Sequence, residues 1–266
     1  MVLYDVPDGT YSIELDIRQG IGPDQTRGKP RFVAQRQLVT VGGADVSGIV
    51  ISLAEGARVS GTIVVEGDKP LPQRGQISLE PVGGRTQFST GGTQRDLWSK
   101  GQFFTDGLAA GEHLVRVRVF DRNYYVKSIT WNERDLLRQP LKVAEGEEIK
   151  DVRIVLSRDV GKVSGRLVSE EGRKPLASAW YMLVPSDQTK WDRGEFFISG
   201  YTDHQGAFKA TGAPGEYIVV TRPPTVEPSS LSEFLREQST GPRVTLKPDE
   251  QSEVEIVVPA KKREGG

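Results

Sequence analysis

Apolar and polar residues alternate in many short segments of this chain. In residues 114–120, LVRVRVF, Val115, Val117 and Val119 alternate with arginines, and in residues 252–258, SEVEIVV, aliphatic residues alternate with glutamates. A period of two is typical of a strand with one face on a core and one in solvent. We expect antiparallel sheets, because roughly seven such strands in about 100 residues is the rhythm of an immunoglobulin-like β-sandwich.

One segment departs from this alternation. In residues 228–239, PSSLSEFLREQS, Ser230 and Glu233 have the spacing of a capping box, and apolar residues follow at helical spacing. The sequence predicts one short helix near the C-terminus that lies across a sandwich edge and buries Phe234 and Leu235. A helix that binds a partner is the alternative interpretation.

The chain repeats itself with a nearly constant period. The motif VSG at 59–61 recurs 104 residues later at 163–165, and EG-x-KPL at 66–71 recurs 105 residues later at 171–176. A rival match, WSKGQFF with WDRGEFF, has an offset of 93 residues. We prefer to pair Gly101 with Gly206, because that pairing keeps step with the motifs on both sides.

The repeat divides the chain into units. PDGTYSIEL near the N-terminus matches APGEYIVV in the last unit, so the first residues resemble the back half of a further copy. We expect a truncated half repeat at 1–56, two complete sandwiches at 57–158 and 159–260, and a tail at 261–266. A domain begun in its middle would leave sheet edges open, so we interpret Met1 as an internal start and expect more copies upstream.

Composition narrows the possible functions. Gly is 30 of 266 residues, which suits many tight turns, and Lys+Arg 35 against Asp+Glu 36 gives a net charge of −1. A nucleic-acid partner is disfavoured, because phosphate binding needs a basic excess on one face. Cys is 0, which excludes disulfides and thiol chemistry. The sequence shows neither a signal peptide nor an apolar run long enough to span a membrane.

The complete copies resemble the bacterial carboxypeptidase regulatory-like domain, a transthyretin-like or prealbumin-like sandwich of the carbohydrate-binding-like fold. The resemblance covers residues 57–259 and rests on VSGTI and VSGRL, KPL, TDHQGAFKATGAPGEY, and the closing VRIVLS and VEIVVP. It implies no active site, and therefore no enzyme. It also implies a module of a larger exported bacterial protein, located outside the cytoplasm: periplasmic, outer-membrane-associated or secreted.

The residues themselves offer little catalytic chemistry. The two histidines, His113 and His204, are interpreted as a packed and a solvated side chain, and no cluster supplies the three or four ligands that zinc takes. Neither a G-x-S-x-G motif nor a catalytic Ser/His/Asp set is visible. We therefore expect no catalytic residues, no metal and no cofactor.

Two tryptophans keep a binding function open. Trp98 and Trp191 fall in polar, glycine-flanked loops, where an exposed indole would stack on a sugar ring, although a loop tryptophan also commonly covers the end of its own core. The first hypothesis is a non-catalytic structural spacer whose partners are other domains of a longer chain. The alternative is a carbohydrate-binding module that uses these tryptophans. Exposed indoles beside a groove would favour binding, whereas buried indoles and a fixed interdomain angle would favour the spacer.

Overall fold

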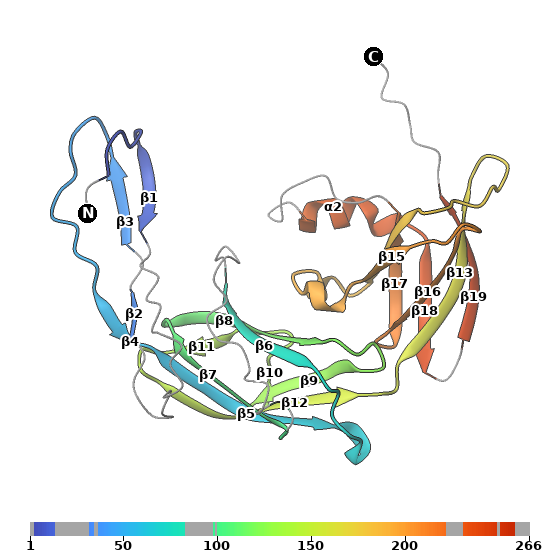
Figure 1. Ribbon diagram of the computed structural model, residues 1–266, viewed down its shortest axis with the longest axis horizontal. Helices are drawn as coiled ribbons and strands as arrows, with labels where there is room; N and C mark the ends of the chain where they lie inside the picture. The colour runs from blue at the N-terminus through green and yellow to red at the C-terminus, as the bar shows by residue number, and fades with distance from the viewer. Residues whose placement is uncertain are drawn as a thin grey trace.

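The structure is a computed structural model that describes residues 3–13, 32–34, 37–82, 98, 100–221, 231–248 and 251–258 (Figure 1). The described chain is mostly β-strand, arranged as two consecutive sandwiches with one short α-helix near the C-terminus. The predicted fold class is therefore confirmed.

The first sandwich comprises residues 57–157 and packs two sheets around one core. Its larger sheet has the order β10-β9-β12-β5-β7, with β10 Arg134–Asp135, β9 Tyr125–Trp131, β12 Glu148–Ser157, β5 Ala57–Val65 and β7 Gln102–Leu108. Its smaller sheet has the order β11-β8-β6, with β11 Leu141–Val143, β8 Gly111–Val119 and β6 Gly75–Pro81. The short 3-10 helix η1, Glu66–Asp68, follows β5.

The second sandwich comprises residues 161–258. One layer has β13 Gly161–Ser169 between β16 Ala207–Gly212 and β19 Gln251–Val258. The other has the order β15-β14-β17-β18, with β15 Ile198–Tyr201, β14 Trp180–Pro185, β17 Gly215–Val220 and β18 Arg243–Pro248. A single residue pair, Gly161 with Pro248, joins the layers along one side.

Six strands of each sandwich occupy equivalent places. Strand β5 pairs with β7 and β12 as β13 pairs with β16 and β19, and β8 pairs with β6 and β11 as β17 pairs with β14 and β18. The strands β9, β10 and β15 lie outside this correspondence. Gly101 and Gly206 occupy the same site: both have positive φ, +67° and +72°, and their carbonyls accept the N–H of Ile63 and Leu167. The pairing of Gly101 with Gly206 is therefore confirmed, and the match at an offset of 93 residues is not a structural equivalence.

The first and last strands of each sandwich pair in parallel, which differs from the expected antiparallel sheets. β12 runs beside β5, and β19 runs beside β13. The VSG glycines sit at these pairings: a Cβ on Gly61 would lie 1.8 Å from the Val152 carbonyl oxygen, and one on Gly165 would lie 2.5 Å from that of Val254. Alternation in sequence marks a half-buried strand, but it does not reveal the direction of the neighbouring strand.

The predicted helix is present as α2, Leu231–Glu237, but it covers the outer face of a sheet rather than an edge. Leu235 is buried against outward-facing residues of β14 and β17, and Phe234 packs on the same cluster. This outer cluster comprises Met182, Val184, Trp191, Ile218, Val220 and Leu235. Because β14 and β17 are buried on both faces, their sequences are continuous apolar runs. Ser230, the predicted N-cap, lies outside the described residues.

The N-terminal part forms two small pairings. β1, Gly9–Ile13, pairs antiparallel with β3, Gln37–Val41, and β2, Phe32–Ala34, pairs with β4, Leu53–Glu55. The β1–β3 pair stands apart from the sandwiches in Figure 1, and the β2–β4 pair lies beside the first sandwich. Tyr11 lies in β1 at the position that corresponds to His113 in β8 and Tyr217 in β17.

One side-chain bond recurs at this position in all three units. Tyr11 donates to the carbonyl of Pro7 at 2.7 Å, Tyr217 donates to that of Ala213 at 2.8 Å, and His113 Nε2 lies 2.8 Å from that of Ala109. His113 is buried, as expected for a packed histidine. Burial raises the pKa of Tyr217 to about 12, so its hydroxyl remains a donor.

Replacing Tyr217 with phenylalanine removes this hydroxyl and leaves the Ala213 carbonyl without its donor. We expect the free energy of unfolding to fall by about 1–2 kcal/mol, measured by chemical denaturation. Tyr201→Phe is the matched control, because Tyr201 is 71% exposed and a surface substitution changes stability by no more than about 0.5 kcal/mol. Equal effects of the two substitutions would contradict a structural role for the bond.

Candidate functional site at the joint between the sandwiches

The connection between the two sandwiches is short and anchored. β12 ends at Ser157 and β13 begins at Gly161. Within the connection, the Asp159 N–H donates to the Ser157 hydroxyl oxygen at 3.2 Å, and the guanidinium of Arg158 lies 5.3 Å from the ring centre of Tyr124. A connection of this length leaves little freedom for the two sandwiches to move apart.

A loop of the second sandwich supplies the main contact with the first. Residues 186–197, between β14 and β15, contain η2, Gln188–Lys190, and η3, Gly194–Phe196. Asp187 starts η2 by accepting the hydroxyl and the N–H of Thr189 at 2.7 and 3.1 Å. These bonds hold the pKa of the Asp187 carboxyl below its usual value.

Trp191 fixes this loop to its own sandwich. The indole is 5% exposed within the outer cluster, and its Nε1–H donates to the carbonyl of Pro185 at 2.8 Å. The chain then turns toward the first sandwich, so Trp191 and Arg193, two residues apart, are buried on opposite sides of the joint.

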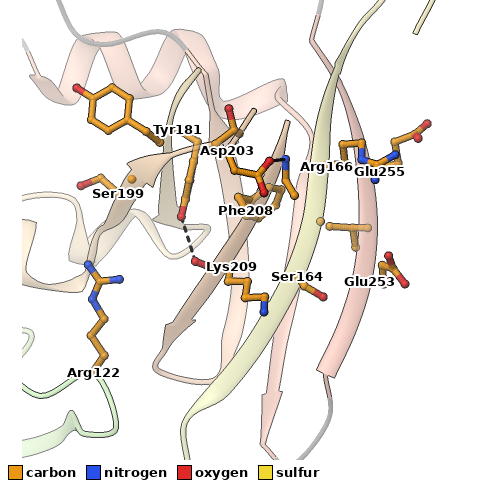
Figure 2. A pocket seen from close by; sticks show the side chains of 16 residues that line it. Arg122, Ser164, Arg166, Tyr181, Ser199, Asp203, Phe208, Lys209, Glu253 and Glu255 are labelled. Carbon is orange, nitrogen blue, oxygen red and sulfur yellow. Dashed lines mark hydrogen bonds between the residues drawn. The ribbon is translucent and has the colours of Figure 1, made fainter. Parts of the chain in front are cut away.

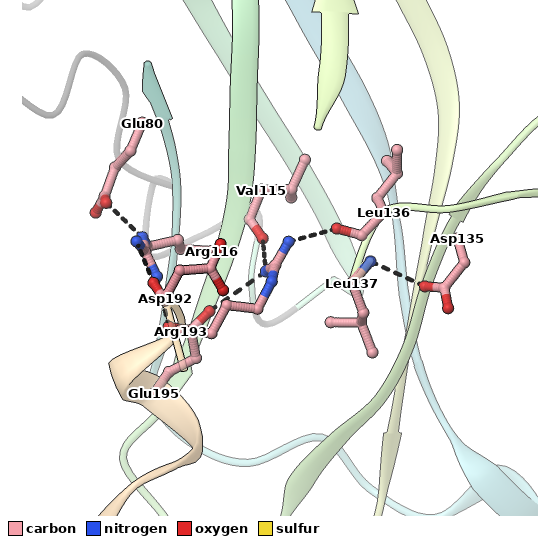
Figure 3. Close-up of polar contacts among 9 residues, drawn as sticks. All are labelled: Glu80, Val115, Arg116, Asp135, Leu136, Leu137, Asp192, Arg193 and Glu195. Carbon is pink, nitrogen blue, oxygen red and sulfur yellow. Dashed lines mark hydrogen bonds and ion pairs between the residues drawn. The ribbon is translucent and has the colours of Figure 1, made fainter. Parts of the chain in front are cut away.

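Arg193 reaches into the first sandwich and is only 1% exposed. Figure 3 shows its guanidinium donating to two carbonyls, that of Val115 in β8 at 2.9 Å and that of Leu136 after β10 at 2.5 Å. β11 pairs with β8 only as far as His113, so the Val115 carbonyl lies beyond the last pair of that ladder. Burial lowers the pKa of Arg193, which Glu195 at 3.5 Å opposes. The fork-shaped guanidinium therefore sets the position of one sandwich on the other.

A second arginine crosses the joint in the opposite direction. Arg116, in β8, pairs with Glu80 of its own sandwich and with Glu195 of the loop at 2.9 Å, and it donates to the carbonyl of Asp192 at 2.8 Å (Figure 3). Burial opposes the charge of Arg116, yet Glu195 and Glu80 together raise its pKa. Phe196 adds apolar contact with the core of the first sandwich.

The tryptophans singled out in the sequence are both buried. Trp98 is 2% exposed in the core of the first sandwich, donates to the carbonyl of Pro72 at 2.8 Å, and lies over Gly75, where a Cβ would approach the ring to 2.0 Å. Trp191 belongs to the outer cluster of the second sandwich. Neither indole presents a face on which a sugar would stack in this structure.

A separate open depression of about 990 Å³ lies on the second sandwich, with Arg122 of the first sandwich at its rim (Figure 2). Its lining mixes both charges, with Arg166 and Lys209 near Glu253 and Glu255. Several of its polar groups hold the fold. Asp203 accepts the N–H groups of Gln205 and Ala207. Tyr181 donates to the carbonyl of Lys209, and Glu255 pairs with Arg173. The bonds from Ala207 and Gln205 lower the pKa of Asp203.

Within the described part of the chain, no three or more His, Cys, Asp or Glu side chains come together as metal ligands would. In the same residues, no helix combines the length and apolar character needed to cross a bilayer.

No protein-family model matches this sequence, and no curated protein matches it either. Similar solved structures include a Streptococcal ancillary pilin, 14% identical, with 95% of this chain and 76% of that chain covered and a TM-score of 0.30. The minor pilin of Streptococcus agalactiae is 13% identical over 79% and 100%, with a TM-score of 0.33. The major pilin subunit of Bacillus cereus is 10% identical over 77% and 99%, with a TM-score of 0.25. Scores this low establish no common function, and the resemblance to carboxypeptidase regulatory-like domains stays a prediction.

Proposed function

We propose that this chain is a non-catalytic structural spacer in which two sandwiches, at 57–158 and 159–260, hold a fixed mutual orientation within a larger exported bacterial protein. The observation that carries the proposal is Arg193, a buried side chain of one sandwich that donates to two main-chain carbonyls of the other. The carboxypeptidase regulatory-like resemblance supports the location outside the cytoplasm and the other domains of a longer chain as partners.

The physical argument compares this joint with an ordinary domain contact. Two domains joined by a linker move relative to each other by default, unless the contact between them is large or specifically held. Here the linker is three residues long, Arg193 and Arg116 cross the joint in opposite directions, and Glu195 contacts both arginines. Opening the joint would exchange the two hydrogen bonds from Arg193 for bonds to water, and a hydrogen bond from a charged donor contributes a net of about 1.5–3 kcal/mol, so the closed arrangement is favoured.

The proposal is tested by measuring the distance between the sandwiches. Because the chain has no cysteine, Glu145→Cys and Glu171→Cys create two spin-label sites, one on each sandwich. We expect a single narrow distance distribution, as narrow as that of the pair Glu171→Cys and Lys209→Cys within the second sandwich. A broad or bimodal distribution for the first pair alone would overturn the spacer.

The carbohydrate-binding alternative is tested independently. We expect the intrinsic tryptophan fluorescence to stay unchanged when the folded chain is titrated with a panel of bacterial and plant polysaccharides, because Trp98 and Trp191 are buried. A saturable shift that disappears in Trp98→Phe or Trp191→Phe would establish glycan binding at that indole. Phenylalanine keeps an aromatic ring in the core, so loss of the shift would not simply reflect unfolding.

A further inference from the structure

The N-terminal strand pair β1–β3 has the same register as a strand pair in each complete sandwich. Tyr11 faces Val39 as His113 faces Leu141 and as Tyr217 faces Val244. The preceding glycines, Gly9, Gly111 and Gly215, face Val41, Val143 and Leu246 respectively. The shared bond to the carbonyl four residues earlier extends this match to the side chains. β1 and β3 are therefore built as the counterparts of β8 and β11.

In both complete sandwiches the counterpart of β1 pairs with a further strand on its other edge. β6 pairs with β8 and places Pro81 opposite His113, and β14 pairs with β17 and places Pro185 opposite Tyr217. The next residue donates its N–H to the carbonyl of Glu112 or Glu216, at 2.8 and 2.9 Å. Among the strands that the structure describes, none pairs with β1 on this edge.

The same region leaves its apolar side chains uncovered. Tyr11 is 36% exposed, whereas His113 and Tyr217 are 2% and 3% exposed. Nine of the twelve exposed large hydrophobic side chains of the described chain fall between residues 3 and 53: Leu3, Tyr4, Tyr11, Phe32, Leu38, Val46, Ile49, Val50 and Leu53. Two of them, Tyr11 and Leu38, lie on the β1–β3 pair itself. Exposed apolar side chains on a strand pair with an open edge are typical of a binding site for an added strand.

We propose that the open edge of β1 binds a strand of the β6 and β14 type, presented by a partner polypeptide. The two complete sandwiches define its pattern, since Ile77, Leu79 and Pro81 in β6 correspond to Tyr181, Leu183 and Pro185 in β14. The partner strand runs antiparallel to β1 and places its proline opposite Tyr11. The aliphatic residue two positions before the proline lies opposite Ile13. The residue after the proline donates its N–H to the carbonyl of Thr10. This site does not depend on the rigid joint.

The probe is a fluorescein-labelled peptide of residues 74–82, RGQISLEPV, titrated with the full chain and followed by fluorescence anisotropy. We expect saturable binding and slower hydrogen exchange at the Thr10 amide. The control peptide carries Asp in place of Ile77 and Leu79, and it should bind about tenfold more weakly or worse, because it has lost the apolar side chains that would be buried. Equal binding of both peptides, or no binding, would overturn the proposal.

A pair of chain variants locates the site. Thr10 corresponds to Glu112, whose carbonyl accepts the N–H of Val82 next to β6. In an antiparallel ladder the N–H and the carbonyl of one residue point to the same neighbouring strand. The Thr10 N–H therefore lies on the open edge of β1. Thr10→Pro removes that N–H and should weaken peptide binding about tenfold or more, since a proline cannot donate to an added strand. Thr10→Val should bind normally, although it equally loses the Thr10–Thr40 hydroxyl contact. Equal binding by both variants would contradict the proposal.

Two further outcomes are decisive. If the chain without peptide sediments as a dimer that Thr10→Pro dissociates, a second copy occupies the edge and the partner strand is excluded. If Thr10→Pro disrupts the β1–β3 pair, seen as faster exchange of the Tyr11 amide, the comparison of the two peptides on the unmodified chain still decides the proposal.

Discussion

Replacing Arg193 with alanine is expected to release the two sandwiches from each other while both stay folded. The substitution leaves the carbonyls of Val115 and Leu136 buried without a donor, at a cost of about 1–3 kcal/mol each. When the joint opens, water hydrates these carbonyls and the cost is relieved. The substitution therefore increases the motion of one sandwich relative to the other more than it lowers the stability of either. Between spin labels at Glu145→Cys and Glu171→Cys, we expect the narrow distance distribution to become broad.

Arg173→Ala is the matched control for this prediction. Arg173 also pairs with a glutamate, Glu255, but its side chain is 63% exposed, and exposed pairs contribute only about 0–1 kcal/mol. We expect the distance distribution of Arg173→Ala to match that of the unmodified chain. A narrow distribution in Arg193→Ala as well would show that Phe196 and the short connection hold the joint without the guanidinium.

The largest loss of stability is expected from Trp191→Ala. The indole fills the outer cluster between β14, β17 and α2, and truncation of a buried tryptophan costs about 3–5 kcal/mol. The loop that carries Arg193 also loses its anchor, so stability and interdomain order should fall together. Chemical denaturation gives the free energy of unfolding, and the spin-label distances give the order.

Tyr201→Ala provides the comparison for this truncation. It removes an aromatic ring that is 71% exposed and should change stability by no more than about 0.5 kcal/mol. If Trp191→Ala were as mild, the outer cluster would contribute nothing to stability and the loop would need another anchor.

The repeat and its strands could be predicted because local chemistry determines them. Gly61 and Gly165 are required where a backbone carbonyl passes too close for a Cβ, and Gly101 and Gly206 where φ is positive. Such requirements recur wherever the fold recurs, so the spacing of these glycines along the chain indicates the length of one sandwich unit.

The joint could not be predicted in the same way. Arg193 has the same side chain as the exposed Arg173, and only the loop's tertiary position decides which one is buried. The available signal was the loop after β14, which carries WDRGEFF between polar residues. That stretch resembles residues 98–104, where tryptophan recurs but Lys100 stands in the place of Arg193, so the likeness marks the aromatic position and not the arginine.

The sequence also contains a signal for the burial of β14 and β17 on both faces. Residues 180–184, WYMLV, and 217–220, YIVV, lack the alternation seen elsewhere. Such runs indicate that something covers the outer face of β14 and β17. The covering elements, α2 and Trp191, come from segments far apart in sequence, and no local pattern links them.

The parallel pairing of first and last strands determines how each sandwich would carry a mechanical load. When the chain is pulled from its two ends, β13 is drawn from its beginning and β19 from its end, in opposite directions along eight matched residue pairs from Lys162–Gln251 to Ser169–Val258. The force therefore acts along the strands, and the hydrogen bonds between them must break together rather than one after another. β5 and β12 are loaded in the same way, so tension is resisted at the strand pair where the chain enters and leaves each sandwich.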